Sequence, residues 1–323
     1  MPKKLGFLSY SAHLRNKVIP SIKKNKDIIP SAILSRGNSV NIDQYFKNSK
    51  IYKNKIKFFL DKSFSTVYIS SITANHFKDC MLAIKYHKNV ICEKPICQNS
   101  NQLKKLLSFA KRKKLKIDEM YQYCFHPLFY KINKILKNKI LGKIKSIDSA
   151  FVAPITDKKN FRFKKDLGGS SLFDVGVYPI STLIFLLKKK DYKIISSKTF
   201  YKKNIKVDIM GVANIKSGKI QAKLSWGYNF PYQNYIKIIG TKGTLMSKFI
   251  FSKKISQVAN IKIAFKNKIQ NIKIKKSNQI NNAFNFYLNR TKSKNYYKKN
   301  ILLLNLLSQI KRNSEKIYYI SKR

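Results

Sequence analysis

Short apolar runs alternate with segments of helical spacing over the first third of the chain. Between two of these runs, HFKDCMLAIKYH places Phe77, Cys80 and Ile84 on one helical face. The runs are bounded by turn residues, as buried strands are, and read KLGFLS, PSAILS, TVYISS, NVICE and LKIDEMYQY. Strands that alternate with helical crossovers predict a parallel sheet, which we place at residues 1–122.

The rest of the chain has a different texture, with long β-rich stretches to about residue 275 and hairpin cues at IKSGKI and GTKGTL. These stretches predict a large, mostly antiparallel sheet, one face of which packs on helices at 126–138 and 174–187. Two further helical segments, NQINNAFNFYLNR and NILLLNLLSQIKRNSEK, close the chain. We therefore predict an α/β protein with a parallel-sheet domain at 1–122 and an α+β domain with an open sheet at 123–323.

Composition supports two folded domains, because 44% of the 323 residues are hydrophobic. The net charge of +54 suggests anionic partners at first sight. The lysines, however, are spread evenly among many Asn and Ile residues with few arginines, which indicates biased codon usage rather than a binding patch. We expect no specific nucleic-acid partner; the alternative predicts association with DNA or RNA that depends steeply on salt.

The cysteine spacing and the amino-terminal sequence indicate in which cellular compartment the protein is expected. Cys80, Cys92, Cys97 and Cys124 form neither a CxxC pair nor a metal-ligand pattern, so we expect reduced thiols and no bound metal. The opening MPKKLGFLSY has no long apolar run, and we find no apolar run near eighteen residues elsewhere. These features predict a cytoplasmic protein without a membrane partner.

Two stretches contain candidate chemistry. In VICEKPI, Lys94 follows an apolar strand and precedes a proline, at the sheet edge where α/β proteins bind ligands; the alternative is one more surface lysine. In LGGSSLFDVGVYPIS, Asp174 and Tyr178 are four residues apart and share a helical face. A phenol near an ammonium is favoured in its ionised form, which suits proton exchange with a hydroxyl or carbonyl. The alternative is a tyrosine packed in a core.

The order and spacing of ICEKPI, EMYQYCFHP, NFRF and DLGGSSLFDVGVYPIS resemble the glucose-fructose oxidoreductase, inositol dehydrogenase and MocA family of NAD(P)-dependent oxidoreductases. The chain is most similar to the branch of aldose and dimeric dihydrodiol dehydrogenases, over nearly its whole length. The resemblance implies a Rossmann-type first domain and a homodimer or homotetramer. It also implies hydride transfer between a nicotinamide cofactor and the carbinol or carbonyl carbon of a sugar-like substrate.

The resemblance also implies roles for single residues. Lys94 and Tyr178 match the catalytic lysine and the proton-exchanging tyrosine, and Asp174 matches the nearby carboxylate. The side chains expected at the substrate are Tyr123, His126, Arg162 and Asp174. The family pattern is broken where Cys124 replaces an arginine and where Ile72 and Thr73 replace a Pro-Asn pair.

The opening turn, GFLSYSAHL, is a modified dinucleotide fingerprint by the same resemblance. It keeps Gly6, has Ser9 at a glycine position and has Ser11 where alanine is tolerated. Ser9 must either accept the tight-turn backbone or shift the loop, and its hydroxyl can donate to a pyrophosphate. The predicted cofactor-binding residues are Gly6, Ser9, Ser11, Ala12, His13, Ser35, Arg36, Ser71, Thr73, His76, Glu93 and Lys94.

The end of the second predicted strand bears on cofactor choice. Ser35 and Arg36 stand where NAD-binding folds place an acidic residue, which favours NADP over NAD unless Arg36 merely stacks on adenine. The departures at Ser9, Ile72, Thr73 and Cys124 leave an alternative function open. That alternative is a catalytically degenerate, cofactor-binding sensor of the same fold.

Overall fold

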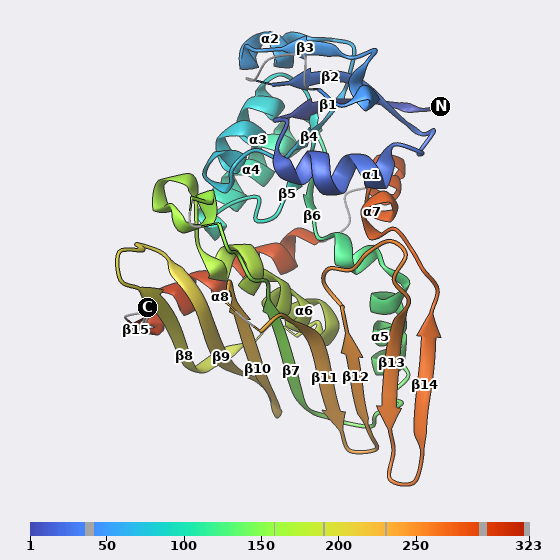
Figure 1. Cartoon of the computed structure of the whole chain (residues 1–323), viewed down its shortest axis with the longest axis vertical. Helices are drawn as coiled ribbons and strands as arrows, with labels where there is room; N and C mark the ends of the chain where they lie inside the picture. Colours follow the sequence, from blue (N-terminus) through green and yellow to red (C-terminus); the bar gives the residue numbers. More distant parts are fainter. Residues whose placement is uncertain (36–41, 158, 190, 230, 291–295, 320–323) are drawn as a thin grey trace. The chain divides into compact units, whose positions relative to one another are not determined.

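The computed structural model describes residues 1–35, 42–157, 159–189, 191–229, 231–290 and 296–319. The chain forms two compact units (Figure 1). The first comprises Met1–Gln122 with Asn278–Tyr296, and the second comprises Tyr123–Ser277 with Tyr297–Arg323.

The first unit contains a six-stranded parallel sheet in the order β3-β2-β1-β4-β5-β6. Its strands are β1 (Lys3–Leu8), β2 (Ile28–Leu34), β3 (Lys50–Tyr52), β4 (Thr66–Ile69), β5 (Asn89–Glu93) and β6 (Ile117–Met120). This is the strand order of Rossmann folds, in which the ligand crevice lies beyond the carboxyl ends of the strands. The predicted parallel sheet is confirmed, and the sequence pattern missed only the short edge strand β3 among these six.

The helices of the first unit are α1 (Ile19–Ile22), which continues a wider π-helical turn at Leu14–Val18, α2 (Lys55–Leu60), α3 (His76–Lys85), α4 (Ser100–Arg112) and α7 (Gln279–Asn289). From the sequence, residues 278–290 are expected in the second domain, but they belong to the first unit. The Asn25 amide donates to Asn281 and Asn285 at 2.7 Å, and the Tyr287 hydroxyl donates to the Glu119 carbonyl at 2.8 Å. An amphipathic pattern predicts the helix but does not show which sheet it covers.

The second unit contains a nine-stranded sheet in the order β14-β13-β12-β11-β7-β10-β9-β8-β15. Its strands are β7 (Ile144–Val152), β8 (Lys193–Lys202), β9 (Asp208–Ser217), β10 (Ile220–Gly227), β11 (Gln233–Gly240), β12 (Thr244–Lys248), β13 (Ala259–Ala264), β14 (Ile269–Ile274) and β15 (Glu315–Tyr319). Neighbours run antiparallel except for the parallel pairs β7–β10 and β8–β15. The predicted mostly antiparallel sheet and both of its hairpins are confirmed.

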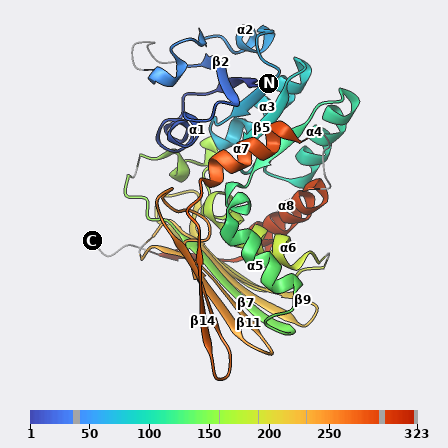
Figure 2. The same ribbon diagram turned by 90° about the vertical axis from the view of Figure 1, so that its right-hand side faces the viewer.

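One face of this sheet is covered by α5 (Pro127–Lys137), α6 (Val177–Leu187) and α8 (Tyr296–Asn313) (Figure 2). Helix α6 contacts β7 and β10, and α5 contacts β13. The stretch Lys165–Leu187 is long and apolar enough to cross a membrane, but 89% of its apolar window is buried, as in the core helix of a globular domain. The sequence shows no unbroken apolar run here because GGSS and Asp174 interrupt its apolar residues.

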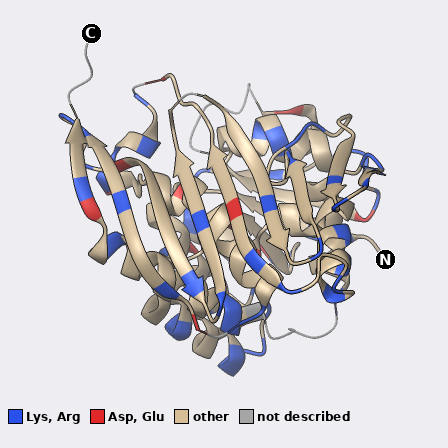
Figure 3. Ribbon diagram, turned by 90° about the horizontal axis from the view of Figure 1, so that it is seen from below, with Lys and Arg blue, Asp and Glu red and all other residues tan. Residues whose placement is uncertain are grey.

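The other face of the sheet is open, with exposed side chains such as Gln221, Lys223 and Lys237. Lysines recur along the strands (Figure 3). Lys223 on β10 and Lys237 on β11 are the direct cross-strand neighbours of Asp148 on β7. The Tyr235 hydroxyl also donates to Asp148 at 3.1 Å. Opposite charges on adjacent strands stabilise the pairing of β7 with both neighbours.

Candidate functional site

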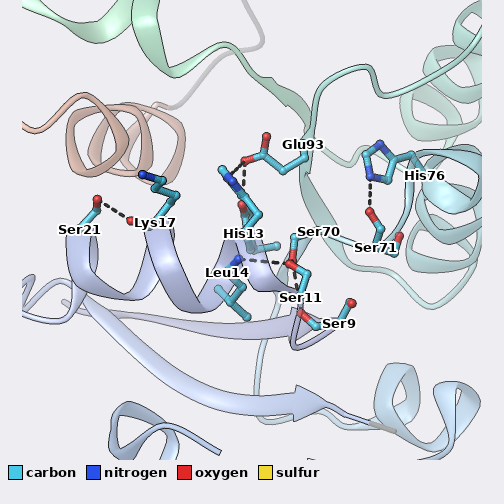
Figure 4. A network of polar contacts seen from close by, with 11 residues as sticks. Ser9, Ser11, His13, Leu14, Lys17, Ser21, Ser70, Ser71, His76 and Glu93 are labelled. Carbon is cyan, nitrogen blue, oxygen red and sulfur yellow. Dashed lines mark hydrogen bonds and ion pairs between the residues drawn. The ribbon is translucent and has the colours of Figure 1, made fainter. Parts of the chain in front are cut away.

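The turn after β1 has the left-handed backbone that suits glycine, with φ of 87° at Ser9. Ser9 therefore accepts the tight turn, at a cost of about 1–2 kcal/mol for a residue with a side chain. A helix begins directly after the turn, and its Leu14 amide donates to the Ser11 hydroxyl at 3.1 Å (Figure 4). The amides of Ala12 and His13 lie in the first turn of this helix. Amides in a first helical turn have no carbonyl partner within the helix. A tight turn leading into a helix start fits the pyrophosphate of a dinucleotide.

Gly6 and Ser35 lie on the strands that lead to this region. A Cβ at Gly6 would come within 2.4 Å of the Phe64 ring, so the glycine is required for packing inside β1. Ser35 is buried directly after β2, and its amide donates to the Tyr52 carbonyl at 3.0 Å. Arg36 lies outside the described residues, so its contact with a 2′-phosphate stays a prediction.

The end of β5 links the predicted catalytic lysine to the opening turn. Glu93 is buried and lies 3.2 Å from the His13 ring (Figure 4). It also accepts a hydrogen bond from the Tyr68 hydroxyl at 2.7 Å. Burial raises the pKa of Glu93, but His13, Tyr68 and Lys94 together bring that pKa below its ordinary value. Glu93 is thus a carboxylate at neutral pH. Lys94 follows it, half-buried, before a cis peptide bond to Pro95.

His76 joins the end of β4 to the same loop. Its side chain is buried, with Nδ1 2.9 Å from the Pro95 carbonyl and Nε2 2.8 Å from the Ser71 carbonyl. Burial lowers the pKa of His76 despite these two acceptors. The Ser71 hydroxyl in turn donates to Asp79 at 2.6 Å. A neutral imidazole has one N–H and can donate to only one of these two carbonyls, but the ring lies between both, so the geometry indicates that it positions the loop after Lys94. Thr73 begins the 3-10 turn Thr73–Asn75 that precedes α3.

In the second unit, Arg162 and Asp174 are brought together. The Arg162 Nε donates to Asp174 Oδ2 at 2.5 Å, and the Tyr228 hydroxyl lies 3.4 Å from the same oxygen. Burial lowers the pKa of Arg162, but the Asp174 charge outweighs this effect and raises it overall. Their side chains are 32% and 22% exposed. The pair can therefore offer both a donor and an acceptor to a polyhydroxy ligand.

Tyr178 lies in the first turn of α6 and is held by aromatic rings. Its ring centroid is 5.0 Å from that of Phe151, 5.6 Å from that of Phe251 and 5.7 Å from that of Tyr123. Tyr123 is fully buried, and its hydroxyl shares a 2.7 Å hydrogen bond with Ser181. The cluster fixes the Tyr178 ring at the start of the helix, close enough to Arg162 for the two groups to interact electrostatically.

His126 caps α5, because its Nδ1 accepts the Leu128 amide hydrogen at 3.0 Å. The side chain is fully buried, and within the described residues its Nε2 has no hydrogen-bond partner. Burial, reinforced by the charge of Lys253, lowers the pKa of His126 to about 4. Tyr123 and His126 thus contact the protein itself in this structure, and their contact with a substrate stays a prediction.

The pKa of His126 predicts acid sensitivity of the second unit. Above the ordinary value of 6.5 the imidazole is neutral in both states, but between 6.5 and about 4 the unfolded chain gains a proton that the folded chain excludes. Stability should therefore fall as pH drops through this window. Denaturant unfolding of H126N, which keeps a capping oxygen, should show a shallower pH dependence than wild type. H87N, at an exposed position, is the control; equal slopes for H126N and wild type would contradict the assignment.

Asp208, which the sequence pattern did not single out, holds the start of the segment that bears Asp174 and Tyr178. Its Oδ1 accepts from the Ser170 hydroxyl at 2.6 Å, and its Oδ2 accepts from the Ser171 hydroxyl at 2.5 Å and the Leu172 amide at 2.7 Å. The carboxylate is buried. A wide π-helical turn, Leu172–Gly176, follows before α6 begins. The serine pair before a helical pattern is the usual signal for a cap, but the distant partner leaves no trace in the local sequence.

Comparisons with known proteins agree with this architecture. The model of an oxidoreductase family with an NAD-binding Rossmann fold matches residues 17–121, and the model of the GFO/IDH/MocA C-terminal domain matches residues 129–246. Trans-1,2-dihydrobenzene-1,2-diol dehydrogenase of Xenopus laevis is 26% identical over 64% of this chain and 62% of its own length. The dTDP-3,4-didehydro-2,6-dideoxy-alpha-D-glucose 3-reductase of Actinomadura kijaniata is 25% identical over 58% and 56%.

The matches with these curated relatives span only about three fifths of the relatives' length. A crystal structure of a 3-ketoreductase from Actinomadura kijaniata, in complex with NADP and TDP-benzene, covers 99% of this chain and 100% of its own, with a TM-score of 0.93 and 18% identity. At 18% sequence identity, this similarity shows a shared fold and nothing more. Because the two family models together match more than half of the sequence, the chain belongs to the glucose-fructose oxidoreductase, inositol dehydrogenase and MocA family of oxidoreductases.

Proposed function

We propose that this protein is an NAD(P)-dependent oxidoreductase that transfers a hydride between a nicotinamide cofactor and the carbinol or carbonyl carbon of a sugar or sugar-like polyhydroxy compound. The observation that carries the proposal is the Ser9 turn, which keeps a glycine-like backbone, φ 87°, at the cost of strain and leads directly into a helix. The relatives named for a dihydrodiol and for a dTDP-sugar support this substrate class.

Each proposed role belongs to a residue already described. The nicotinamide supplies or accepts the hydride when it is bound. We assign proton exchange with the substrate oxygen to the Tyr178 phenol, and binding of that oxygen to the Lys94 ammonium. The Arg162–Asp174 pair, partly exposed on the second unit, would orient further hydroxyl groups.

A substrate panel tests the proposed activity. Purified protein with NADP⁺ or NADPH is mixed with aldoses, inositols, diols, nucleotide-linked sugars and the corresponding ketones, and reduced nicotinamide is followed by absorbance. We expect turnover with at least one of these compounds. Saturable cofactor binding with no turnover across the panel would favour the degenerate sensor instead.

We propose NADP as the preferred cofactor, with NAD as the weaker one. Arg36 should pair with the 2′-phosphate, so R36A should weaken NADPH binding by about tenfold while NADH binding changes by less than about twofold. Titration of both cofactors measures this, and K47A, which removes an exposed charge from the same unit, is the control. Equal weakening of NADPH and NADH would show that Arg36 stacks on adenine instead.

We also propose that the protein works in the cytoplasm as a homodimer or homotetramer. All four cysteines are free, which suits a reducing compartment. The open face of the nine-stranded sheet offers a broad surface for association. Light scattering on purified protein measures the oligomeric state.

A further inference from the structure

A chain of hydroxyl hydrogen bonds surrounds the strained turn after β1 (Figure 4). The Leu14 amide donates to Ser11 Oγ at 3.1 Å, Ser11 Oγ donates to Ser70 Oγ at 3.1 Å, and Ser70 Oγ donates to the Ser9 carbonyl at 3.3 Å. An amide nitrogen can only donate and a carbonyl can only accept. The two ends therefore fix the direction of the whole chain, in which each hydroxyl accepts once and donates once.

Ser70 lies at the end of a different strand from the one that leads into the turn. It follows β4 and is only 5% exposed. Its amide donates to the Leu8 carbonyl at 3.2 Å, while its hydroxyl donates to the next carbonyl, that of Ser9. The end of β4 thus holds two successive carbonyls, the second of which belongs to the residue with positive φ.

A serine at this position needs such a restraint, whereas a glycine does not. Glycine occupies positive φ about as readily as negative φ, but a residue with a Cβ gains free energy by leaving the left-handed region. Because the peptide unit is planar, fixing the Ser9 carbonyl also fixes the direction of the Tyr10 amide. A relaxed Ser9 would rotate this peptide and change the shape of the turn before the helix.

We propose that Ser70 is a positioning residue, which holds the Ser9 turn in the form that receives the pyrophosphate of the dinucleotide. The inference rests on the proposed function, because it assumes that the turn binds the cofactor. In this inference, the Ser70 hydroxyl after β4 restrains a backbone that glycine would adopt without restraint. Ser70 should therefore matter only while residue 9 carries a side chain.

Fluorescence titration with NADPH tests whether the effect of Ser70 depends on the side chain of residue 9. The four proteins compared are wild type, S70A, S9G and S9G/S70A. Loss of one hydrogen bond to the strained turn should raise the NADPH dissociation constant of S70A about fivefold. The S9G/S70A protein should bind within about twofold of S9G. The matched control is S21A, which removes an exposed hydroxyl that donates to the Lys17 carbonyl at 2.7 Å on the following helix and should bind as wild type does (Figure 4).

Each outcome decides the inference. An unchanged dissociation constant in S70A, or an equal loss in the wild-type and S9G backgrounds, overturns it, because a general packing role would not depend on residue 9. If S70A fails to fold, recovery of folding and binding in S9G/S70A supports the inference, and failure of the double variant counts against it. Absence of NADPH binding in wild type is a separate result, which rejects the proposed function before any variant is compared.

Discussion

Replacing Tyr178 by phenylalanine should lower turnover by about a hundredfold or more and leave NADPH affinity within about twofold. Only the hydroxyl is lost, since the ring stays in its aromatic cluster with Phe151, Phe251 and Tyr123. The cofactor turn belongs to the first unit and is unchanged by the substitution. K94A should lower turnover by a similar factor. The comparison requires kcat on the best substrate of the panel together with an NADPH titration.

The matched control for Y178F is Y235F. It removes a phenol hydroxyl in the same unit, one that donates to Asp148 at 3.1 Å on the open face of the sheet. Y235F should retain turnover close to that of wild type. Near-normal turnover in both Y178F and K94A would refute the catalytic roles of these two residues, even if the protein binds NADPH.

Replacing Asp208 by alanine should destabilise the second unit by about 2–4 kcal/mol and reduce turnover as well. The substitution leaves two serine hydroxyls and the Leu172 amide without their buried acceptor, at the start of the segment that carries Asp174 and Tyr178. D208N keeps one acceptor oxygen and should be less destabilised than D208A.

The only tryptophan of the chain reports on this region. Trp226 lies against the π-helical turn, since a Cβ at Gly176 would come within 2.9 Å of its ring. Denaturant unfolding followed by Trp226 fluorescence gives the loss of stability, with D191A at an exposed acid of the same unit as the control. A change in unfolding free energy below about 0.5 kcal/mol in D208A would contradict the role assigned to Asp208.

The sequence pattern predicted the two sheets because their strands are long or strongly apolar. It did not identify β3 and β15, which lie at sheet edges, nor the central strand β7, which follows α5 closely and does not stand out from the helical segment before it. It also predicted the helix at 278–290, but amphipathicity records only that one face is buried. That this helix packs on the first unit depends on contacts such as Asn25 with Asn281, which are far apart along the chain.

The candidate site was predictable where a residue type itself signals chemistry. The sequence predicts both Arg162 and Asp174 as site residues, but it does not predict that they pair directly. For Ser9 the sequence left two possibilities, a strained turn or a shifted loop, and only the backbone angle of 87° decides between them. The sequence does not point to Ser70 or Asp208, because a serine after a strand and an aspartate at the start of one are common. Their importance comes from partners distant in the sequence.

The most direct test of the central claim is titration of the wild-type protein with NADPH and with NADH. Moderate salt is needed to screen the net charge of +54, which would otherwise bind the anionic cofactors nonspecifically. We predict saturable binding of both cofactors, with NADPH bound more tightly, because the Ser9 turn and Arg36 receive the phosphates. Failure to bind either cofactor would contradict the account, since the turn after β1 would then have no dinucleotide to hold.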